Sequence, residues 1–491
     1  MVNSYIGIDL GTSAVKLLLV DEKGNILAET SEEYPVSYPH GGWSEQDPRD
    51  WMNAIRRGMV TLMKGVDPAS VRGLSFGGQM HGLVMLDASD EVIRPAILWN
   101  DGRTQEETDY LNNVIGKDKL SKMTANIAFA GFTAPKIMWV RKHEPENFAR
   151  ISKIMLPKDY VAYMLTGTHC TDLSDASGML LLDVENGKWS REMCEICGVQ
   201  PSWLPKLYRS YEPVGKLTPS AAAALGLTEN VVVVAGAGDN AAAAIGTGTV
   251  GDGACNISLG TSGTIFIASD KFSVDKANAL HSFRHADGSY HLMGCMLSAA
   301  ACNKWWIEDI LHADHAEEQK GMTKLGCNEV YFLPYMMGER SPHNDVDARS
   351  LFVGMRPDTT RGDMGLAVME GVAFGLRDCL EVARAGGVRV TRTRICGGGA
   401  RSAVWRKVVA NVLGMPVDTV ATEKGPSYGA ALLAMVGCGA YDSVRAACDA
   451  CVSLSGTTLP DKKLTADYDK RYNVFRLIYP AMKGVFKAMK D

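Results

Sequence analysis

Short apolar runs separated by glycine-containing turns dominate the start of the chain. Residues 5–10 and 15–20 are strongly apolar and flank a Gly-Thr-Ser turn at residues 11–13. A second turn at residues 21–25 leads to a third apolar run at residues 26–28. Because apolar runs joined by short turns are typical of antiparallel hairpins, the pattern predicts three consecutive β-strands.

The same arrangement recurs in the middle of the chain. Residues 255–259 and 264–268 are apolar runs on either side of a turn at residues 260–263. The tetrapeptide Leu-Gly-Thr-Ser begins at Leu10 and again at Leu259, an offset of 249 residues, which is half the chain length. A hairpin repeated at this offset indicates two domains of related architecture.

Helical and strand-like segments surround both hairpins. Helical spacing is seen at residues 51–62, 363–380 and 401–413, and strand-like runs are seen at residues 231–234 and 394–396. Mixed helices and strands in both halves predict an α/β fold. A glycine-dense segment at residues 246–253 is typical of a hinge, so we expect domains at residues 1–249 and 250–491.

Composition narrows the class of protein. The 491 residues are 46% hydrophobic and 22% charged, and 51 Lys+Arg against 56 Asp+Glu give a net charge of −5. A chain without basic excess is not expected to bind nucleic acid or an acidic membrane. The sequence shows neither a basic leader nor an apolar span of roughly 20 residues, so we expect a cytoplasmic protein without a membrane partner.

Two CxxC pairs occur among the twelve cysteines, Cys194/Cys197 and Cys448/Cys451. A zinc ribbon needs its second pair roughly 15–20 residues after the first, whereas these pairs stand about half the chain apart. The sequence therefore favours reduced, structural thiols over a metal or redox site.

Each glycine turn offers backbone N–H groups and short hydroxyls. Small residues let a backbone approach phosphate oxygens closely, so Gly11, Thr12 and Ser13, with Gly260 and Thr261, form a candidate polyphosphate clamp. A single turn of this kind is more simply a plain hairpin. The matched pair, one turn in each half of the chain, favours the clamp.

Asp9 interrupts an apolar strand directly before the first turn. A carboxylate in that position is unfavourable unless it is paired or bound to a cation. Hydrated Mg²⁺ beside a nucleotide prefers one or two carboxylates together with phosphates, so Asp9 is a candidate metal ligand. The second hairpin has Ser258 at the equivalent place, so the two halves are not chemically equivalent.

Asp239 follows the strand at residues 231–234 and precedes an alanine-rich helix. A carboxylate at a strand end in an α/β protein faces a cleft, where it acts as a general base toward a hydroxyl attacking a γ-phosphate. The alternative is a helix N-cap, which Asp favours. The sequence leaves both interpretations open.

Other nucleotide motifs are absent or out of context. The chain contains no Gly-x-x-x-x-Gly-Lys-Ser/Thr sequence. A GxGxxG at Gly246, Gly248 and Gly251 follows a helix instead of a strand, which excludes the dinucleotide-binding context. The Gly-rich turn at residues 397–402 follows a strand and opens a helix, so it either faces an adenosine or permits close strand–helix contact.

These motifs together resemble the FGGY carbohydrate kinases over nearly the whole chain. The resemblance is carried in order by residues 6–13, 43–48, 78–82, 97–103, 131–136 with Trp139, 156–160, 238–240, 259–263, 338–344, 352–355, Asp363, 370–371 and 397–402. One such motif is moderate evidence, and the ordered series is strong evidence.

The resemblance implies an α/β fold of two ribonuclease-H-like domains, of the sugar kinase/Hsp70/actin superfamily, flanking a catalytic cleft. It implies ATP-dependent phosphorylation of D-xylulose at its terminal hydroxyl to give D-xylulose 5-phosphate, with ATP and Mg²⁺. Alternatives are a kinase for another ketose or polyol such as ribulose or glycerol, a sugar sensor without catalysis, and a non-catalytic nucleotide-dependent interaction protein. The glycerol kinases of the family carry Arg-Glu where residues 79–82 read Gln-Met-His-Gly, which disfavours glycerol.

The resemblance also implies roles for individual residues. Asp239 is the expected proton acceptor, and Asp9 serves the Mg–ATP site, with both carboxylates as metal ligands. The expected sugar contacts are Met80, His81, Trp99, Asp101 and Asn240. The expected nucleotide contacts are Gly11, Thr12, Ser13, Gly260 and Thr261 at the phosphates and Gly398 and Gly399 behind the adenosine.

The tail from Leu464 has the apolar spacing of an amphipathic helix. Such a helix packs on its own domain or contributes to a homodimer contact. The sequence favours the first interpretation.

Overall fold

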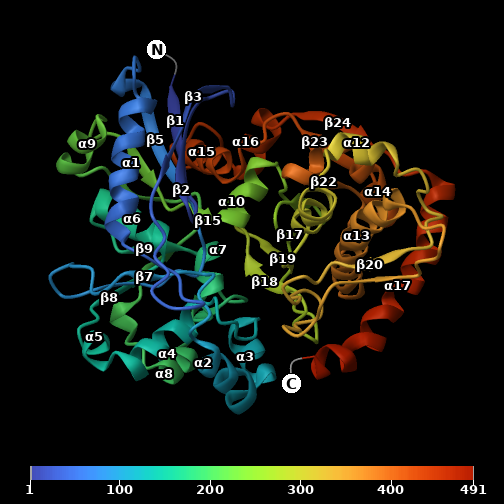
Figure 1. The fold of residues 1–491 in the computed structure, drawn as a ribbon. Helices are drawn as coiled ribbons and strands as arrows, with labels where there is room; N and C mark the ends of the chain where they lie inside the picture. Colours follow the sequence, from blue (N-terminus) through green and yellow to red (C-terminus); the bar gives the residue numbers. More distant parts are fainter. Residues whose placement is uncertain (1–2, 490–491) are drawn as a thin grey trace.

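The computed structural model describes residues 3–489 and contains two seven-stranded sheets, each flanked by helices (Figure 1). The first sheet has the order β13 (Pro213–Lys216), β14 (Val232–Val234), β5 (Val71–Gly78), β1 (Ser4–Leu10), β2 (Ala14–Asp21) and β3 (Ile26–Glu33), with β15 (Ala237–Gly238) also paired to β5. Strands β1 and β2 form the predicted hairpin, in which Leu10 pairs with Val15.

The second sheet repeats this pattern. Its order is β18 (His281–Arg284), β19 (Tyr290–Met296), β17 (Gly263–Ser269), β16 (Cys255–Leu259), β22 (Thr393–Cys396), β23 (Val417–Val420) and β24 (Leu454–Thr458). In both sheets an antiparallel hairpin is followed by a parallel pair on the far side of its first strand: β1 pairs with β5, and β16 with β22. The repeated tetrapeptide therefore marks equivalent positions in two sheets of matching topology.

Shorter strand pairs and helices complete the architecture. The pairs are β4 (Glu45–Gln46) with β7 (Ala96–Ile97), β6 (Val84–Leu86) with β8 (Lys153–Met155), β9 (Cys170–Asp172) with β12 (Lys206–Tyr208), β10 (Leu182–Asp183) with β11 (Lys188–Trp189), and β20 (Tyr331–Leu333) with β21 (Leu351–Val353). The helices before β16 are α1 (Pro48–Leu62), α2 (Gln105–Asp109), α3 (Lys117–Thr124), α4 (Thr133–His143), α5 (Pro145–Ala149), α6 (Pro157–Thr166), α7 (Leu173–Ala176), α8 (Arg191–Cys197), α9 (Pro219–Leu225) and α10 (Asp239–Gly246). Those after it are α11 (Ala300–Lys304), α12 (His315–Lys320), α13 (Arg361–Ala385), α14 (Ala403–Leu413), α15 (Gly425–Gly437), α16 (Val444–Cys451) and α17 (Lys462–Ala488). Short 3₁₀ turns are η1 (Pro68–Ser70), η3 (Ser177–Met179), η4 (Pro201–Trp203) and η6 (Gly398–Arg401), and π-helical turns are η2 (Tyr110–Gly116) and η5 (Trp305–Ile310).

Capping side chains and a local turn explain where three of the predicted helices begin. Helix α1 begins at Pro48, because the Asp47 side chain accepts a hydrogen bond from the Arg49 N–H and caps the first turn. Helix α13 begins two residues before the predicted 363, because Thr360 and Asp363 form a capping box at its start, and it continues past the predicted 380 to Ala385. Helix α14 begins two residues later than predicted, because residues 398–401 form a 3₁₀ turn.

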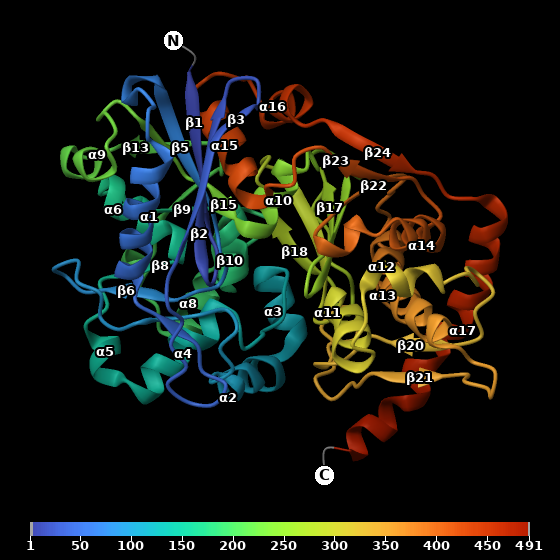
Figure 2. The same cartoon turned by 45° about the horizontal axis from the view of Figure 1, so that its top comes forward.

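The two halves of the chain share a hydrophobic core at their junction. This core combines Tyr5 and Leu18 of the first sheet with Phe266 of the second, and adds the buried faces of α10 and α15. Helix α15 comes from the second half, yet it lies directly against β1 and β5, as Figure 2 also shows. A Cβ on Gly7 of β1 would stand 1.8 Å from the Ser427 carbonyl oxygen.

Helices α10 and α15 cross at glycines. A Cβ on Gly429 would lie 1.8 Å from the Ala242 carbonyl oxygen, and a Cβ on Gly246 would lie 2.6 Å from the Gly425 oxygen. Only glycine permits two helix backbones to approach this closely. The crossing fixes α10, and with it Asp239, against the second half of the chain.

Helix α17 packs on its own half of the molecule. Tyr468, Tyr472 and Phe475 belong to the core of the second sheet, together with α13 and α14. This confirms the interpretation of the tail as a helix that packs within the chain, while the homodimer stays a prediction. Within residues 3–489 we find no helix with the length and hydropathy needed to cross a membrane.

The CxxC cysteines lie in apolar surroundings. Cys194 and Cys197 belong to the core beneath α4 and α8, and Cys448 belongs to the junction core. Burial raises the pKa of the Cys194 thiol to about 11 and that of Cys197 to about 12. Such thiols are poor metal ligands and poor nucleophiles, which agrees with a structural role.

We expect Gly429→Ala to destabilise the protein, because the added methyl meets the Ala242 carbonyl at the helix crossing. Overpacking of this kind lowers the free energy of unfolding by about 2 kcal/mol. The matched control is Gly484→Ala in α17, where a Cβ meets no atom within 4 Å and the better helix propensity of alanine favours folding by up to ~1 kcal/mol. Urea denaturation measures both, and equal effects would contradict the tight crossing.

Candidate active site

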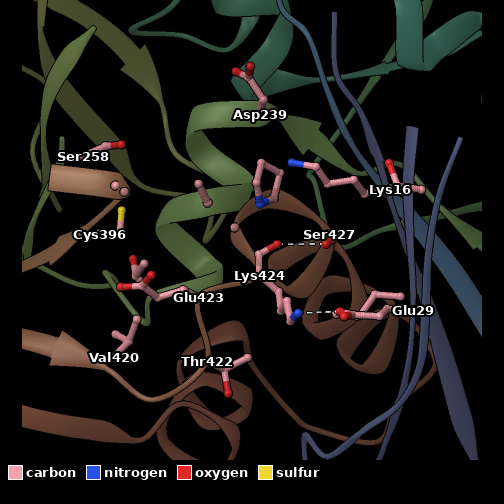
Figure 3. A pocket seen from close by; sticks show the side chains of 18 of the residues that line it. Lys16, Glu29, Asp239, Ser258, Cys396, Val420, Thr422, Glu423, Lys424 and Ser427 are labelled. Carbon is pink, nitrogen blue, oxygen red and sulfur yellow. Dashed lines mark hydrogen bonds and ion pairs between the residues drawn. The ribbon is translucent and has the colours of Figure 1, made fainter. Parts of the chain in front are cut away.

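A cleft of about 840 Å³ lies between the two halves of the chain. Its walls come from β2 and β3, from the start of α10, and from the loops that follow β22 and β23. Figure 3 shows Asp239 at one end of this cleft and Thr422 and Glu423 toward the other. An ion pair closes one side, since Lys424 Nζ lies 2.5 Å from Glu29 Oε2.

Asp9 lies on β1 next to this cleft and is 6% exposed. The hairpin register places it directly opposite Lys16, whose Nζ is 4.0 Å from Asp9 Oδ2 and whose side chain is 63% exposed. Burial raises the pKa of Asp9 to about 7; nearby Lys16 lowers it and the charge of Asp239 raises it. Strand β5 lies between the two carboxylates, since Asp9 pairs with Gly77 on one side of it and Gly238, the residue before Asp239, pairs with Gly78 on the other.

Asp239 is the first residue of α10, and it lines the cleft with Asn240. Gly238 occupies the N-cap position, so Asp239 is not the N-cap of this helix. The Asp239 Oδ1 atom accepts hydrogen bonds from the Asn240 N–H at 2.7 Å and Nδ2 at 3.0 Å. Burial nevertheless raises the pKa of Asp239 to about 6, which places its titration near neutrality.

The second half contributes a glycine-rich wall. Gly398 lines the cleft, and a Cβ there would meet no atom within 4 Å. Gly399 points away, because its Cβ would lie 2.9 Å from Leu259 Cβ and from the ring of Trp405. Of these two expected adenosine contacts, Gly398 therefore borders open space and Gly399 permits strand–helix contact.

The residues of the two hairpin turns, Gly11, Thr12, Ser13, Gly260 and Thr261, are not among those that line the cleft, although Lys16 and Ser258 on the adjoining strands are. In the first turn Thr12 Oγ1 accepts a hydrogen bond from Trp99 Nε1 at 2.9 Å, and Gly11 N donates to Ala14 O at 3.1 Å. In the second turn the Gly260 and Thr261 carbonyls accept hydrogen bonds from the N–H groups at the start of α11. Ser13 and Thr261 are exposed, whereas Thr12 is partly covered.

Met80 and His81 follow β5, and Met80 lies beside the start of α10. A Cβ on Gly238 would stand 3.0 Å from the Met80 sulfur, so Met80 touches the residue before Asp239. The His81 ring stacks on Phe132 at 4.6 Å, and its Nδ1 lies 2.8 Å from the Gly178 carbonyl oxygen. Because a carbonyl only accepts, Nδ1 carries the proton and Nε2 is left as an acceptor. Burial, with Lys136, lowers the pKa of His81 to about 3, so the ring is neutral at pH 7.

Trp99 and Asp101 occupy the loop after β7. Trp99 is 43% exposed and lies over the first turn through its bond to Thr12. Asp101 is buried, and its oxygens accept hydrogen bonds from the Ser44 N–H at 2.6 Å and from Arg103 Nη2 at 2.7 Å. In this arrangement Asp101 holds Arg103; its expected contact with a sugar stays a prediction.

Two charged residues near the site were not identified from the sequence. Lys16 is visible in retrospect, since a hairpin turn at residues 11–13 places residue 16 opposite Asp9. Arg340 reaches from the second half to the ring of Phe129 in the first, at 5.1 Å from its centroid. Only long-range folding brings Arg340 there, so spacing along the chain carries no signal for it.

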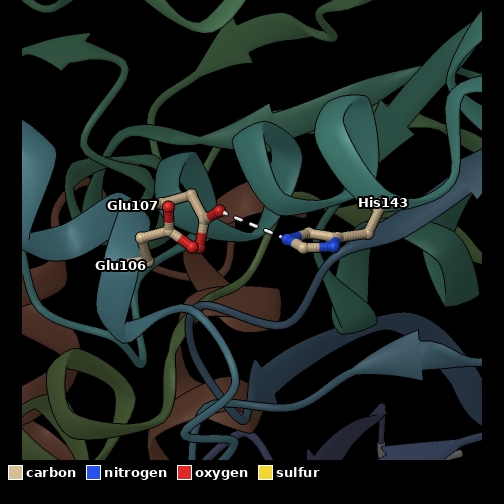
Figure 4. Close-up of side chains that lie close together, drawn as sticks. All are labelled: Glu106, Glu107 and His143. Atoms are coloured by element: carbon tan, nitrogen blue, oxygen red, sulfur yellow. Dashed lines mark ion pairs between the residues drawn. The ribbon is translucent and has the colours of Figure 1, made fainter.

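Another acidic cluster lies outside the cleft. Glu106, Glu107 and His143 place possible ligand atoms within 4.8 Å of one another (Figure 4). Lys142 Nζ already lies 2.5 Å from Glu106 Oε1 and neutralises that carboxylate. We interpret this cluster as a surface ion-pair group and not as a metal centre.

Two matching sheets that face a cleft form the architecture of the actin/Hsp70-like ATPase fold, which sugar kinases share. The N-terminal domain model of the FGGY family of carbohydrate kinases matches residues 4–246, and its C-terminal domain model matches residues 255–438. The chain belongs to the FGGY family of carbohydrate kinases.

Several named proteins are similar over nearly the whole chain. The xylulose kinase of Escherichia coli K12 is 40% identical over 97% of this chain and 98% of its own length. The xylulose kinase of Bacillus subtilis is 36% identical over 99% and 98%. A crystal structure of the xyloylose kinase from Brucella ovis superposes with a TM-score of 0.93 and 38% identity, covering 98% of this chain and 100% of that chain.

We expect Asp9→Asn to stabilise the unliganded protein at high pH. Folding raises the pKa of Asp9 from 3.8 to about 7, so the native protein loses stability as the pH rises through this interval. Asparagine removes that loss, and at pH 8 the variant gains on the order of 2 kcal/mol in free energy of unfolding. The gain becomes smaller at pH 5 and vanishes below pH 3.8.

Urea denaturation at pH 5 and pH 8, without nucleotide or divalent cation, tests this expectation. Asp442→Asn at an exposed position is the control for loss of one negative charge. A gain for Asp9→Asn that is the same at both pH values would contradict the assigned protonation behaviour.

Proposed function

We propose that this protein transfers the γ-phosphoryl group of ATP to the terminal hydroxyl of D-xylulose, giving D-xylulose 5-phosphate and ADP. Support comes from xylulose kinases that are 36–40% identical over nearly their full length. The observation that carries the mechanism is the cleft-lining Asp239 at the start of α10, directly after Gly238, which Met80 contacts.

Asp239 is the proposed general base. Its carboxylate accepts the proton of the sugar hydroxyl while that oxygen forms a bond to the γ-phosphorus and the bond to the ADP oxygen breaks. Burial raises the pKa of Asp239 to about 6, which makes the carboxylate a better proton acceptor while it remains ionised at pH 7 and above. The neutral His81 ring offers Nε2 to a sugar hydroxyl.

Asp9 and Asp239 suit a Mg²⁺ ion brought by ATP. The two carboxylates raise the local negative charge, and the charge of Asp239 itself raises the pKa of Asp9. The one nearby cation in the described residues, Lys16, is mostly exposed and 4.0 Å from Asp9. Oxygen donors of this kind fit Mg²⁺, which when bound neutralises phosphate charge. Asp9 would hold it and Asp239 would adjoin it.

The remaining expected residues keep the roles that the family resemblance implies, and of these Asn240 and Gly398 line the cleft. Residues 1–249 form the proposed sugar-binding domain, with Met80, His81, Trp99, Asp101 and Asn240 on the sugar side. Residues 250–491 form the proposed nucleotide-binding domain, with Gly398 against the adenosine and Gly260 and Thr261 facing the phosphates. Gly11, Thr12 and Ser13 complete the phosphate contacts from the first hairpin.

The substrate is the first point to test. We expect ADP release to depend on added sugar. D-xylulose should give a kcat/KM at least tenfold above that of ribulose, xylitol and glycerol. The reason is that a pocket whose polar groups pair with each substrate hydroxyl rejects analogues that leave one of those buried groups unpaired. A coupled ADP assay across these sugars measures it. Preference for another sugar would assign that substrate instead, and sugar-independent ADP release would favour a nucleotide-dependent interaction protein.

Replacing the proposed base separates chemistry from binding. We expect Asp239→Ala to lower kcat by at least a thousandfold, since the hydroxyl proton loses its acceptor, while the Kd for D-xylulose changes little. Steady-state assays and calorimetric sugar binding measure the two quantities. Near-normal turnover in this variant would refute the assignment of the base.

A further inference from the structure

Two strands end side by side at the proposed active site. Strands β5 and β15 pair in parallel, with Gly78 opposite Gly238 as their last residues. Met80 and His81 follow shortly after Gly78, and Asp239 follows directly after Gly238. The positions of Met80, His81 and the proposed base therefore depend on this one pair of glycines.

A buried charge cluster stands behind that pair. Lys158 Nζ lies 2.7 Å from Asp159 Oδ1, 2.9 Å from Asp172 Oδ1 and 3.7 Å from Asp175 Oδ2, and the Lys158 side chain is 0% exposed. Lys158 fits under the end of β5 only because residue 78 is glycine, since a Cβ there would lie 2.7 Å from Lys158 Cβ. None of these charged residues lines the cleft.

Ser174 connects this cluster to the base. The Ser174 hydroxyl donates to Asp172 Oδ2 at 2.5 Å and accepts from the Gly238 N–H at 3.2 Å. Asp172 caps α7 by accepting from the Ser174 N–H at 2.8 Å, which fixes Ser174 relative to Asp172. A continuous path of polar contacts therefore runs from Lys158 through Asp172 and Ser174 to the peptide that precedes Asp239.

A role in stability alone does not explain the cluster. One lysine faces three carboxylates, and both Asp175 oxygens are buried without a hydrogen-bond partner in the described part of the chain. Buried ion clusters carry a desolvation penalty that well-packed apolar residues avoid. Polar groups, unlike apolar ones, make directional hydrogen bonds. In this cluster the last such bond is the one from the Gly238 N–H to the Ser174 hydroxyl.

We propose that Lys158, Asp172 and Ser174 are positioning residues that hold the Gly238 peptide so that Asp239 faces the sugar hydroxyl. This inference rests on the proposed role of Asp239. Ser174 is its most specific member, because it alone among the three bonds to the Gly238 peptide.

The chain supplies a matched control. The Ser210 hydroxyl donates to the same Asp172 Oδ2 atom at 2.7 Å, and Ser210 is also buried. The Gly238 N–H donates to the Ser174 hydroxyl and not to that of Ser210. Ser174→Ala and Ser210→Ala therefore remove the same kind of bond to the same carboxylate, and only the first removes the bond to the Gly238 N–H.

We expect Ser174→Ala to lower kcat by tenfold or more while KM for D-xylulose and for ATP stays within about threefold, since a small displacement of a reacting group is felt in turnover. Ser210→Ala is expected to keep kcat within about twofold of the unaltered enzyme, with a melting temperature similar to that of Ser174→Ala. Steady-state kinetics and thermal unfolding of the two full-length variants give these values.

The outcomes separate this proposal from the proposed function. If both variants lose the same stability and both keep kcat within twofold, the network is merely structural and the proposal is overturned. A loss of kcat common to both variants also overturns it, because the Gly238 contact is then not responsible. If the unaltered enzyme prefers another sugar, the same comparison is made with that sugar, so a wrong substrate leaves this test intact.

Discussion

The close approach of helices α10 and α15 is the constraint on which the cleft depends. Glycines at positions 246 and 429 allow the two backbones to touch, and Gly7 allows α15 to lie on β1. Since α10 begins with Asp239 and the loop before α15 carries Glu423 and Lys424, one crossing sets both ends of the cleft. A helix from the second half thus forms part of the first half's fold, and the two halves are joined more tightly than by a hinge peptide alone.

The same arrangement buries two acidic side chains, Asp9 and Asp239. Asp9 and Asp239 are held where burial raises the pKa of each to about 7 and about 6. Stability alone does not favour burial of these carboxylates, because the exposed Lys16, 4.0 Å from Asp9, compensates little of the desolvation penalty. In the proposed function, a cation bound with the phosphates of ATP would offset this cost, which is the stability–function exchange common at active sites.

Much of the fold was predictable because its signals are local. The two hairpins, the start of α10 after a strand, and the equivalence of Leu10 and Leu259 all depend on residues close in sequence. The site was only partly predictable. Asp239 and Gly398 line the cleft as expected. The surroundings of Gly399 and Asp101 were not predictable, because Leu259 lies against Gly399 and the Ser44 N–H donates to Asp101, and both partners come from distant parts of the sequence. Lys16 required the strand register and Arg340 the assembly of both halves.

The duplicated hairpin shows how one architecture supports two different tasks. In the first hairpin Asp9 pairs across the strands with Lys16, and in the second Ser258 pairs with Thr264 at the equivalent position. The Asp9 carboxylate carries a negative charge that attracts a cation, whereas the Ser258 and Thr264 hydroxyls are neutral. Because Ser258 lines the cleft and Asp9 lies beside it, the chemical asymmetry of the site follows from two substitutions within one repeated strand pattern.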